Sequence, residues 1–294
     1  MANLKEIRSR ITSVSSTKQI TSAMKMVSAA KLRRAQDAIT QMRPYANKLK
    51  ELLGNLNDNS DGDIESPYVE VREVKTVLLI PITSNRGLAG AFNSNIIKET
   101  NRLIAEEYAQ TDITVLAIGK KADDFFKKTE YNIKGTTLPS HLEQLFDDLS
   151  FDNVSKVAEK IMKSFSFKQF DKVVLVYNEF VNAAVQHVKT EQMLPILPAE
   201  KEESNATRSD YIYEPSQEFI VQELIPKSLK LQLFKCLLDS HAAEHGARMT
   251  AMHKATDNAT ELIKDLKLVY NKARQASITN EILEIVGGAE ALNN

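Results

Sequence analysis

The stretch ANLKEIRSRITSVSSTKQITSAMKMVSAAKLRRAQ, residues 2–36, decides how this chain is organised. Leu4, Ile7, Ile11 and Val14 follow one another at spacings of three and four residues. This spacing is typical of a helix that packs one apolar row against a second helix, as in a coiled coil. The stretch therefore predicts a long N-terminal helix that needs a helical partner.

The apolar row of this helix is interrupted at Lys18. The next apolar residues, Ile20, Met24 and Val27, predict that the row resumes in a shifted register. The other faces carry short serine and threonine side chains, whereas a solvated helix usually carries long Glu and Lys side chains. Drift in composition would explain this, but the pattern favours a helix that another structure surrounds closely without binding it tightly.

A second long run without proline, residues 227–294, closes the chain. Its apolar row extends over residues 249–276, and about 60 residues of helix at about 1.5 Å each would span on the order of 90 Å. The two helices bury most apolar surface if they pair with each other, so we expect a long antiparallel coiled coil. Three glycines are expected weak points, the last two where the helix frays: Gly246, Gly287 and Gly288.

Between the two helices the pattern changes to strands that alternate with helices. Strands are expected at residues 74–82, 113–118, 131–137, 172–177 and 184–193. This alternation predicts right-handed crossovers and a Rossmann-like α/β domain with a mostly parallel sheet. The predicted parts are an N-terminal coiled-coil helix, a central α/β domain, a polar loop with connector, and a C-terminal coiled-coil helix, at residues 1–55, 70–198, 199–215 and 216–294.

Composition limits the class of protein. The net charge of the 294 residues is −1, yet the first fifty residues hold eleven Lys or Arg and two acidic residues, so charge is segregated along the chain. Cys236 is the single cysteine, which rules out an intramolecular disulfide and favours a reducing compartment. No stretch reaches the roughly 18 apolar residues of a membrane span. We expect a soluble chain, which does not exclude work beside a membrane.

Two sequence features call for a test of binding or catalysis. The turn SNRGLAGAFN at residues 84–93 follows a predicted strand, but Gly87 and Gly90 do not meet the GxGxxG pattern of a phosphate-binding loop. His241 and His245 have the spacing of a zinc-chelating pair, but the HExxH order and a third ligand are missing. A structural turn and packed histidines are the better interpretations, so we expect no catalytic residue, no metal and no cofactor.

Three regions of the chain, the last made of two segments, together resemble one protein family. The opening stretch, the turn SNRGLAGAFN, and the segments GARMTAMHKATDNA (246–259) and VYNKARQASITNEILEIVGGAEA (269–291) are similar to gamma subunits of F-type ATP synthases. The similarity covers essentially the whole chain, and its most diagnostic positions lie at the end: Ile278, Thr279, Glu281, Glu284, Gly288, Ala289 and Ala291. Ala89 stands where the family often has cysteine, and this exchange of small residues should matter little.

The resemblance implies a rotor shaft that is not itself an enzyme. It would couple ion flow through a membrane c-ring to the conformational cycling of catalytic beta subunits. The implied partners are a ring of three alpha and three beta subunits, the epsilon subunit and the c-ring, with one copy of this chain per complex. The implied contacts with the alpha/beta ring are Met24, Lys25, Arg248, Arg274, Gln275, Thr279 and Glu281.

The resemblance also implies a location. The chain lacks the paired-cysteine insertion of chloroplast members, and no transit peptide precedes the first matching segment. We therefore expect a bacterial protein at the cytoplasmic face of the inner membrane.

Two other functions remain open at this stage. The basic N-terminal helix could bind nucleic acid or an anionic membrane, although it has no aromatic residue before Tyr45. A small α/β enzyme with helical extensions would use the turn around Gly87 and Gly90. A salt-dependent shift of duplex DNA would favour the first function, and tight binding of a nucleotide would favour the second.

Overall fold

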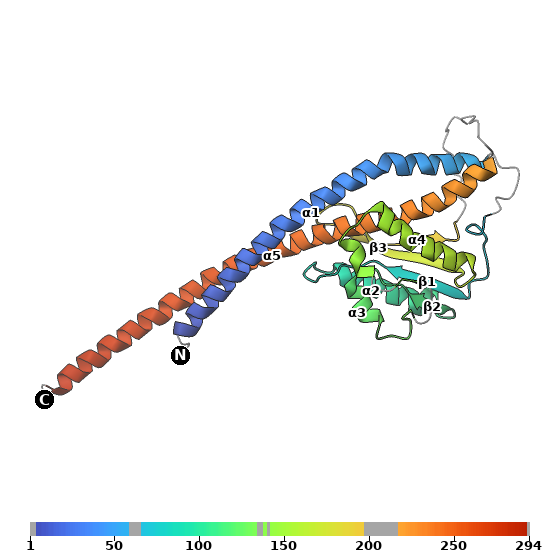
Figure 1. Cartoon of the computed structure of the whole chain (residues 1–294). Helices are drawn as coiled ribbons and strands as arrows, with labels where there is room; N and C mark the ends of the chain where they lie inside the picture. The colour runs from blue at the N-terminus through green and yellow to red at the C-terminus, as the bar shows by residue number, and fades with distance from the viewer. Residues whose placement is uncertain (1–3, 59–65, 134–137, 140–141, 197–216, 293–294) are drawn as a thin grey trace. The chain divides into compact units, whose positions relative to one another are not determined.

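The computed structural model describes residues 4–58, 66–133, 138–139, 142–196 and 217–292 (Figure 1). In chain order the elements are α1 (Leu4–Asp58), β1 (Thr76–Pro81), α2 (Phe92–Arg102), a π-helical turn (Leu103–Glu107), β2 (Asp112–Val115), α3 (Lys120–Phe126), a 3₁₀ turn (Leu142–Phe146), α4 (Phe151–Ser166), β3 (Lys172–Phe180), β4 (Gln186–Leu194) and α5 (Gln217–Leu292). The chain forms two compact units, residues 29–248 and residues 1–28 with 249–294.

A sheet of four strands lies at the centre of the larger unit, in the order β2-β1-β3-β4. β1 pairs in parallel with β2 and β3, and β4 runs antiparallel to β3 at the edge. The sequence of β1, TVLLIP, is apolar almost throughout because a central parallel strand is covered on both faces. The predicted α/β domain with a mostly parallel sheet is confirmed.

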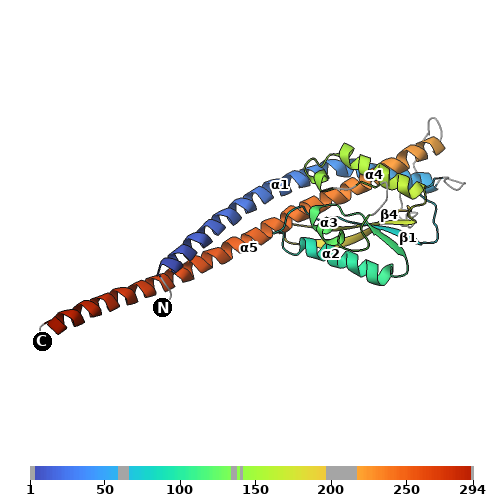
Figure 2. The same cartoon turned by 60° about the horizontal axis from the view of Figure 1, so that its bottom comes forward.

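Helices cover both faces of this sheet (Figures 1 and 2). On one face, α4 and the part of α5 at residues 225–237 bury a core with Leu78, Ile80 and Tyr177. On the other face, α2 and α3 bury a second core with Val77, Leu79 and Val176. Because successive side chains of a strand point to opposite faces, alternate residues of the same strand supply the two cores. α5 is therefore part of the layered domain as well as of the helix pair.

In the smaller unit, α1 and α5 lie side by side in opposite directions, and both termini are at the same end (Figure 2). The predicted antiparallel pair of long terminal helices is confirmed. The row of α1 that turns inward keeps one heptad register, at residues that are buried or half-buried: Ile7, Ile11, Val14, Lys18, Thr21, Lys25 and Ser28. The facing row of α5 is Met252, Thr256, Ala259, Ile263, Leu266, Tyr270, Ala273 and Ser277.

The predicted shift of register at Lys18 is wrong. Lys18 itself occupies an inward position and is half-buried, whereas Ile20 and Val27 are 60% and 57% exposed. The physical reason is that the row continues through small polar residues, and a lysine can lay its aliphatic stem along an apolar surface. At the middle of the row, the hydroxyl groups of Thr21 and Thr256 lie 2.9 Å apart and share a hydrogen bond between the helices.

The predicted fraying of α5 at Gly287 and Gly288 is also wrong. The helix continues through both residues to Leu292, and neither glycine has the positive φ of a helix-ending residue. α5 also starts earlier than the run without proline, at Gln217, and contains Pro226. α1 likewise passes through Pro44 and ends at Asp58.

The central strands differ from the prediction mainly at one place. Of the strand expected at residues 131–137, Asn132 forms an isolated parallel bridge with Val115, and residues 134–137 lie outside the described part. The polar loop expected at residues 199–215 also lies outside the described residues. The division of the chain into four parts stays a prediction. No helix in the described part of the chain is both long and apolar enough to cross a membrane.

Candidate functional site

The carboxyl ends of β1 and β3 form the place where open α/β sheets usually bind their ligands. In this chain the place is filled by its own side chains. Ala89 and Phe92, from the turn after β1, form a small buried cluster with Ala243 of α5. The side-chain amide of Asn178, near the end of β3, donates to the carbonyl oxygen of Phe92 at 3.2 Å. The arrangement joins the turn to α5 through apolar packing and to β3 through this hydrogen bond.

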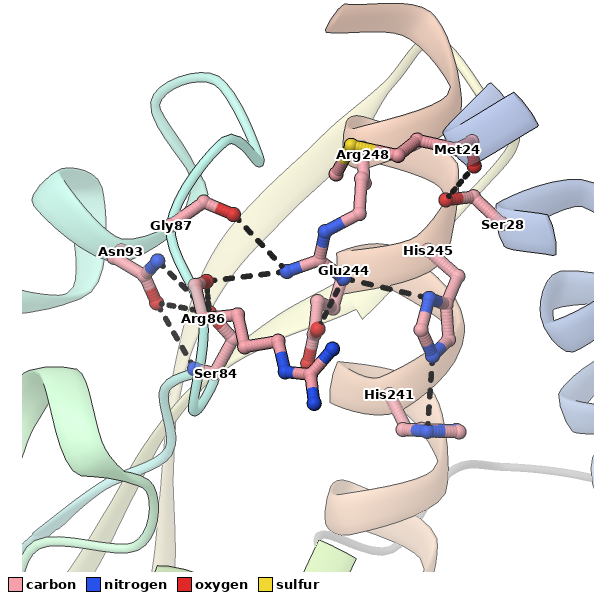
Figure 3. Close-up of polar contacts among 10 residues, drawn as sticks. All are labelled: Met24, Ser28, Ser84, Arg86, Gly87, Asn93, His241, Glu244, His245 and Arg248. Atoms are coloured by element: carbon pink, nitrogen blue, oxygen red, sulfur yellow. Dashed lines mark hydrogen bonds and ion pairs between the residues drawn. The ribbon is translucent and has the colours of Figure 1, made fainter. Parts of the chain in front are cut away.

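The turn at residues 84–93 is held at its base by a pair of polar side chains (Figure 3). The backbone amide of Ser84 donates to Oδ1 of Asn93 at 2.9 Å, and Nδ2 of Asn93 lies 2.9 Å from the Ser84 hydroxyl. That hydroxyl donates to the carbonyl oxygen of Arg86 at 2.6 Å. Within the turn, Leu88 and Gly90 have φ values of +64° and +58°.

A buried ion pair on α5 faces this turn (Figure 3). Nη1 of Arg248 pairs with Oε1 of Glu244, one helical turn earlier, and the two side chains are almost fully buried. Nη2 of Arg248 donates to the carbonyl oxygens of Arg86 at 3.1 Å and Gly87 at 3.4 Å. The guanidinium group therefore links the acidic residue of its own helix to the backbone of the turn.

His241 and His245 continue the cluster along α5. Their Nε2 atoms lie 3.1 Å apart, and Nδ1 of His245 lies 3.5 Å from Nη1 of Arg248. The ring of His241 also stacks on Phe146 with 6.2 Å between centroids. The pair is packed rather than arranged around an ion, and the described residues contain no group of three or more His, Cys, Asp or Glu that could hold a metal.

Burial shifts the titration of this cluster. Burial, together with the charges of Lys31 and Arg248, lowers the pKa of His241 to about 4. The pKa of His245 is lowered to about 3, first by burial and then by electrostatic repulsion from His241, Arg248 and Lys31. Burial raises the pKa of Glu244 above its usual value, while Arg248, Lys31 and Arg86 act against that rise. Both imidazoles are therefore neutral near pH 7, which keeps further positive charge away from Arg248.

The predicted contacts with a surrounding ring fall into two groups. Arg274, Gln275, Thr279 and Glu281 are exposed along the last part of α5, where the Thr279 hydroxyl donates to the carbonyl oxygen of Gln275 at 2.9 Å. Met24 and Lys25 are half-buried on α1, and the Met24 carbonyl oxygen accepts from the Ser28 hydroxyl at 2.8 Å.

Arg248 differs from the other predicted contacts because it is buried and its guanidinium group binds the distant turn at residues 86 and 87. Sequence reasoning missed its partners, Glu244 and the turn at Arg86 and Gly87. The spacing of Glu244 and Arg248 is a visible signal for an ion pair on a helix. The contact with the turn has no local signal, because it joins residues about 160 positions apart.

The comparisons with known proteins agree along the whole chain. A family model described as ATP synthase matches residues 3–292. The ATP synthase gamma chain of Christiangramia forsetii is 62% identical, with all of both chains covered. That of Flavobacterium johnsoniae is also 62% identical over all of both chains, and that of Chlorobaculum tepidum is 48% identical over 99% of each.

Solved structures show the same fold at lower identity. A chain of the Euglena gracilis mitochondrial ATP synthase, in an assembly of OSCP, F1 and c-ring, is similar with a TM-score of 0.68 and 23% identity. The match covers 98% of this chain and 94% of that one. A chain of the Tetrahymena thermophila mitochondrial ATP synthase central stalk and c-ring has a TM-score of 0.56 at 24% identity, covering 80% of this chain and 99% of that one.

Proposed function

Because this chain belongs to the ATP synthase gamma-chain family, we propose that it is the central rotor shaft of an F1Fo ATP synthase. The shaft couples ion flow through a membrane c-ring to conformational changes of the catalytic beta subunits. It carries no catalytic residue itself. Each beta conformation is favoured by the face of the shaft that it meets, so rotation changes nucleotide affinity by shifting populations.

One observation carries this proposal: the helix pair exposes apolar side chains along its length. Ile20 and Val27 of α1 and Leu262 and Val269 of α5 point away from the seam. After Ser277, where the last half-buried position of α5 lies, every position through Ala289 is exposed. These positions include Ile278, Ile282, Leu283, Ile285 and Val286. Exposed apolar rows of this kind mark surfaces that other proteins cover.

We infer that the covering protein is the ring of three alpha and three beta subunits. The contact residues on α5 are Arg274, Gln275, Thr279 and Glu281, whose exposed side chains occupy the stretch where the apolar row is also exposed. On α1 the contacts are Met24 and Lys25, within the basic first fifty residues. A basic helix is complementary to acidic loops of such a ring.

The α/β domain has a different role in the proposal. It packs with the epsilon subunit over the c-ring, and one copy of the chain serves one complex. The complex lies at the cytoplasmic face of a bacterial inner membrane, as supported by the bacterial relatives that match over their full length.

Reconstitution tests the proposal. Membrane vesicles that contain the other subunits should synthesise ATP from an ion gradient with this chain and lose that synthesis without it. The isolated chain should hydrolyse no ATP. Gradient-driven synthesis at an unchanged rate without the chain would contradict the proposed function.

A further inference from the structure

Both terminal nitrogen atoms of the Arg248 guanidinium group form hydrogen bonds within the chain. Nη1 meets the carboxylate of Glu244, and Nη2 meets the carbonyl oxygens of Arg86 and Gly87. A guanidinium group is a rigid planar fork, so holding one end against Glu244 fixes the direction in which the other end donates. The side chain is also buried, which removes water as a competitor for these bonds.

The two carbonyl groups that Arg248 binds directly precede the strained residue of the turn. Leu88 has a φ of +64°, a conformation that residues with a Cβ atom rarely adopt. Its side chain is 64% exposed, so packing of the leucine does not hold this conformation in place. Such a residue persists only where its surroundings determine the backbone.

Other contacts hold the base of the turn and the residue that follows Leu88. Ser84 and Asn93 close its base, and the buried Ala89 holds the far side against Ala243. Both Ser84 and Arg248 donate to the carbonyl oxygen of Arg86. Among these contacts, the hydrogen bond from Arg248 to the carbonyl oxygen of Gly87 is the one that holds the peptide group between Gly87 and Leu88.

We propose that Arg248 is a positioning residue that acts through the turn and not by touching the alpha/beta ring. Held by Glu244, it fixes the peptide groups before Leu88 and so sets the direction in which Leu88 is presented at the surface. In the assembled enzyme this inference rests on the proposed function, since the turn then affects coupling. In the isolated chain the positioning of Leu88 by Arg248 does not depend on the proposed function.

Hydrogen exchange of the isolated full-length chain tests the positioning directly. Arg248→Met keeps the length of the side chain and removes its donors, so the hydrogen-bonded amides of the turn, Phe92 N to the carbonyl oxygen of Ala89 and Ser84 N to Oδ1 of Asn93, should exchange at least about ten times faster, corresponding to about 1.4 kcal/mol. Amides inside β1 and β3 should keep their wild-type rates. Arg274→Met, on an exposed part of the same helix, is the matched control and should leave the turn unchanged.

A second variant covers the case in which Arg248→Met fails to fold. Glu244→Gln keeps Arg248 but weakens its anchor, and should accelerate exchange at the same amides to a smaller degree. Wild-type exchange of the turn in a folded Arg248→Met chain, or in Glu244→Gln when Arg248→Met does not fold, would overturn the inference.

A double-mutant cycle in the assembled enzyme separates action through the turn from direct contact. The measured quantity is the number of ions pumped per ATP hydrolysed, for Leu88→Ala, Arg248→Met and both together. If Arg248 acts through the turn, the double variant should lose little more coupling than the more damaging single variant. Additive losses would overturn the inference. If the complete enzyme works without the chain, the proposed function fails, while the exchange result still decides the positioning role.

Discussion

At the scale of single residues, Asp171 fixes where the first and third strands begin. Its Oδ2 atom accepts from the amides of Lys75 and Thr76 at 3.1 and 2.9 Å and from the Thr76 hydroxyl at 3.0 Å. Burial raises the pKa of this carboxyl group, but the hydrogen bonds and the charge of Arg72 outweigh burial, so its pKa lies below the usual value. The carboxylate therefore stabilises the fold in its charged form.

Asp171→Asn should lower the free energy of unfolding at pH 7 by about 2 kcal/mol, because it removes a charged acceptor of three hydrogen bonds. A carboxyl group whose pKa is lower in the folded state stabilises above its unfolded pKa of about 3.9 and loses this effect as the pH falls through the folded pKa. The difference between wild type and variant, measured by urea unfolding, should therefore shrink below about pH 4. Asp147→Asn, at an exposed position, is the control, and equal losses from both variants would contradict the prediction.

The two buried histidines of α5, His241 and His245, give stability the same dependence on pH for a different reason. Their folded-state pKa values of about 4 and about 3 lie below the unfolded value of about 6.5. As the pH falls below about 6.5, these histidines bind protons in the unfolded chain but not in the folded chain. The free energy of unfolding therefore decreases as the pH is lowered. Asp239 acts in the opposite direction, since burial raises its pKa to about 6.

Replacing both histidines, His241→Gln with His245→Gln, should make stability fall less steeply from pH 6.5 to 4.5. The change in slope should reach at most about 1.4 kcal/mol per pH unit for each histidine. Asp239 is present in both proteins, so their difference isolates the histidines. His253→Gln, with an exposed side chain, serves as control in the same denaturant titration, and an unchanged slope in the double variant would contradict the assignment.

At the scale of elements, the helix pair shows what a sequence pattern can and cannot predict. Spacings of three and four residues predicted the pairing of α1 and α5 correctly, because any long helix must cover an apolar row. The register after Lys18 was predicted wrongly, because Ile20 and Val27 were assumed to face inward. A single sequence does not distinguish an apolar residue that faces a partner helix from one that faces another protein.

Lys18→Leu tests the observed register. Lys18 is half-buried in the inward row, so a leucine there should add apolar contact with α5 and stabilise the helix pair by about 1 kcal/mol. Gln19→Leu, one position away and exposed, should leave stability unchanged. Thermal melting followed by far-UV circular dichroism measures both variants. If Gln19→Leu stabilised the pair and Lys18→Leu did not, the register would be wrong.

The glycines of α5 differ in how much space surrounds them. A Cβ atom at Gly246 would lie 3.2 Å from the Ala183 Cα atom and 3.4 Å from the Phe180 ring, whereas one at Gly287 would meet nothing within 4 Å. The turn between β3 and β4 thus approaches α5 closely at Gly246, and a Cβ atom there would require that turn to shift by a few tenths of an ångström. This requirement depends on tertiary packing, so the sequence alone predicted only a weak point in the helix.

Alanine at the two positions should have opposite effects. Gly287→Ala should raise helicity, since alanine favours a helix over glycine by about 1 kcal/mol. Gly246→Ala should lower the free energy of unfolding by about 1 kcal/mol, because moving the backbone of Ala183 costs more than the helix gains. Circular dichroism and urea unfolding measure the two effects. Stabilisation by Gly246→Ala would show that Ala183 yields easily.

At the scale of the whole molecule, charge and apolar surface are both distributed for assembly rather than for folding. The first fifty residues carry eleven of the basic residues against two acidic ones, while the chain as a whole is nearly neutral. The fold class and this segregation could be read from the sequence. The position of Arg248 against the turn could not, because residues about 160 positions apart meet only in the folded domain.

The last part of α5 provides the clearest separation between stability and function. Residues 278–289 are exposed throughout and include apolar side chains that are 47 to 71% exposed: Ile278, Ile282, Leu283, Ile285 and Val286. Removing residues 278–294 deletes no described residue that is buried within the chain, so the melting temperature should stay unchanged. The truncated chain should also associate less with itself in sedimentation, because it exposes less apolar surface.

In the assembled enzyme the same truncation should have a large effect. If these side chains bear on the alpha/beta ring, the truncated shaft should assemble poorly or lose most gradient-driven ATP synthesis. A matched control replaces Glu261 with Gln, an exposed position of α5 within the paired region, which should keep both synthesis and melting temperature. A truncated chain that melts earlier would mean that the segment stabilises the isolated chain. Full synthesis by the truncated enzyme would instead place the torque-bearing contacts within the paired part of the two helices, where Ile20, Val27, Leu262 and Val269 remain exposed.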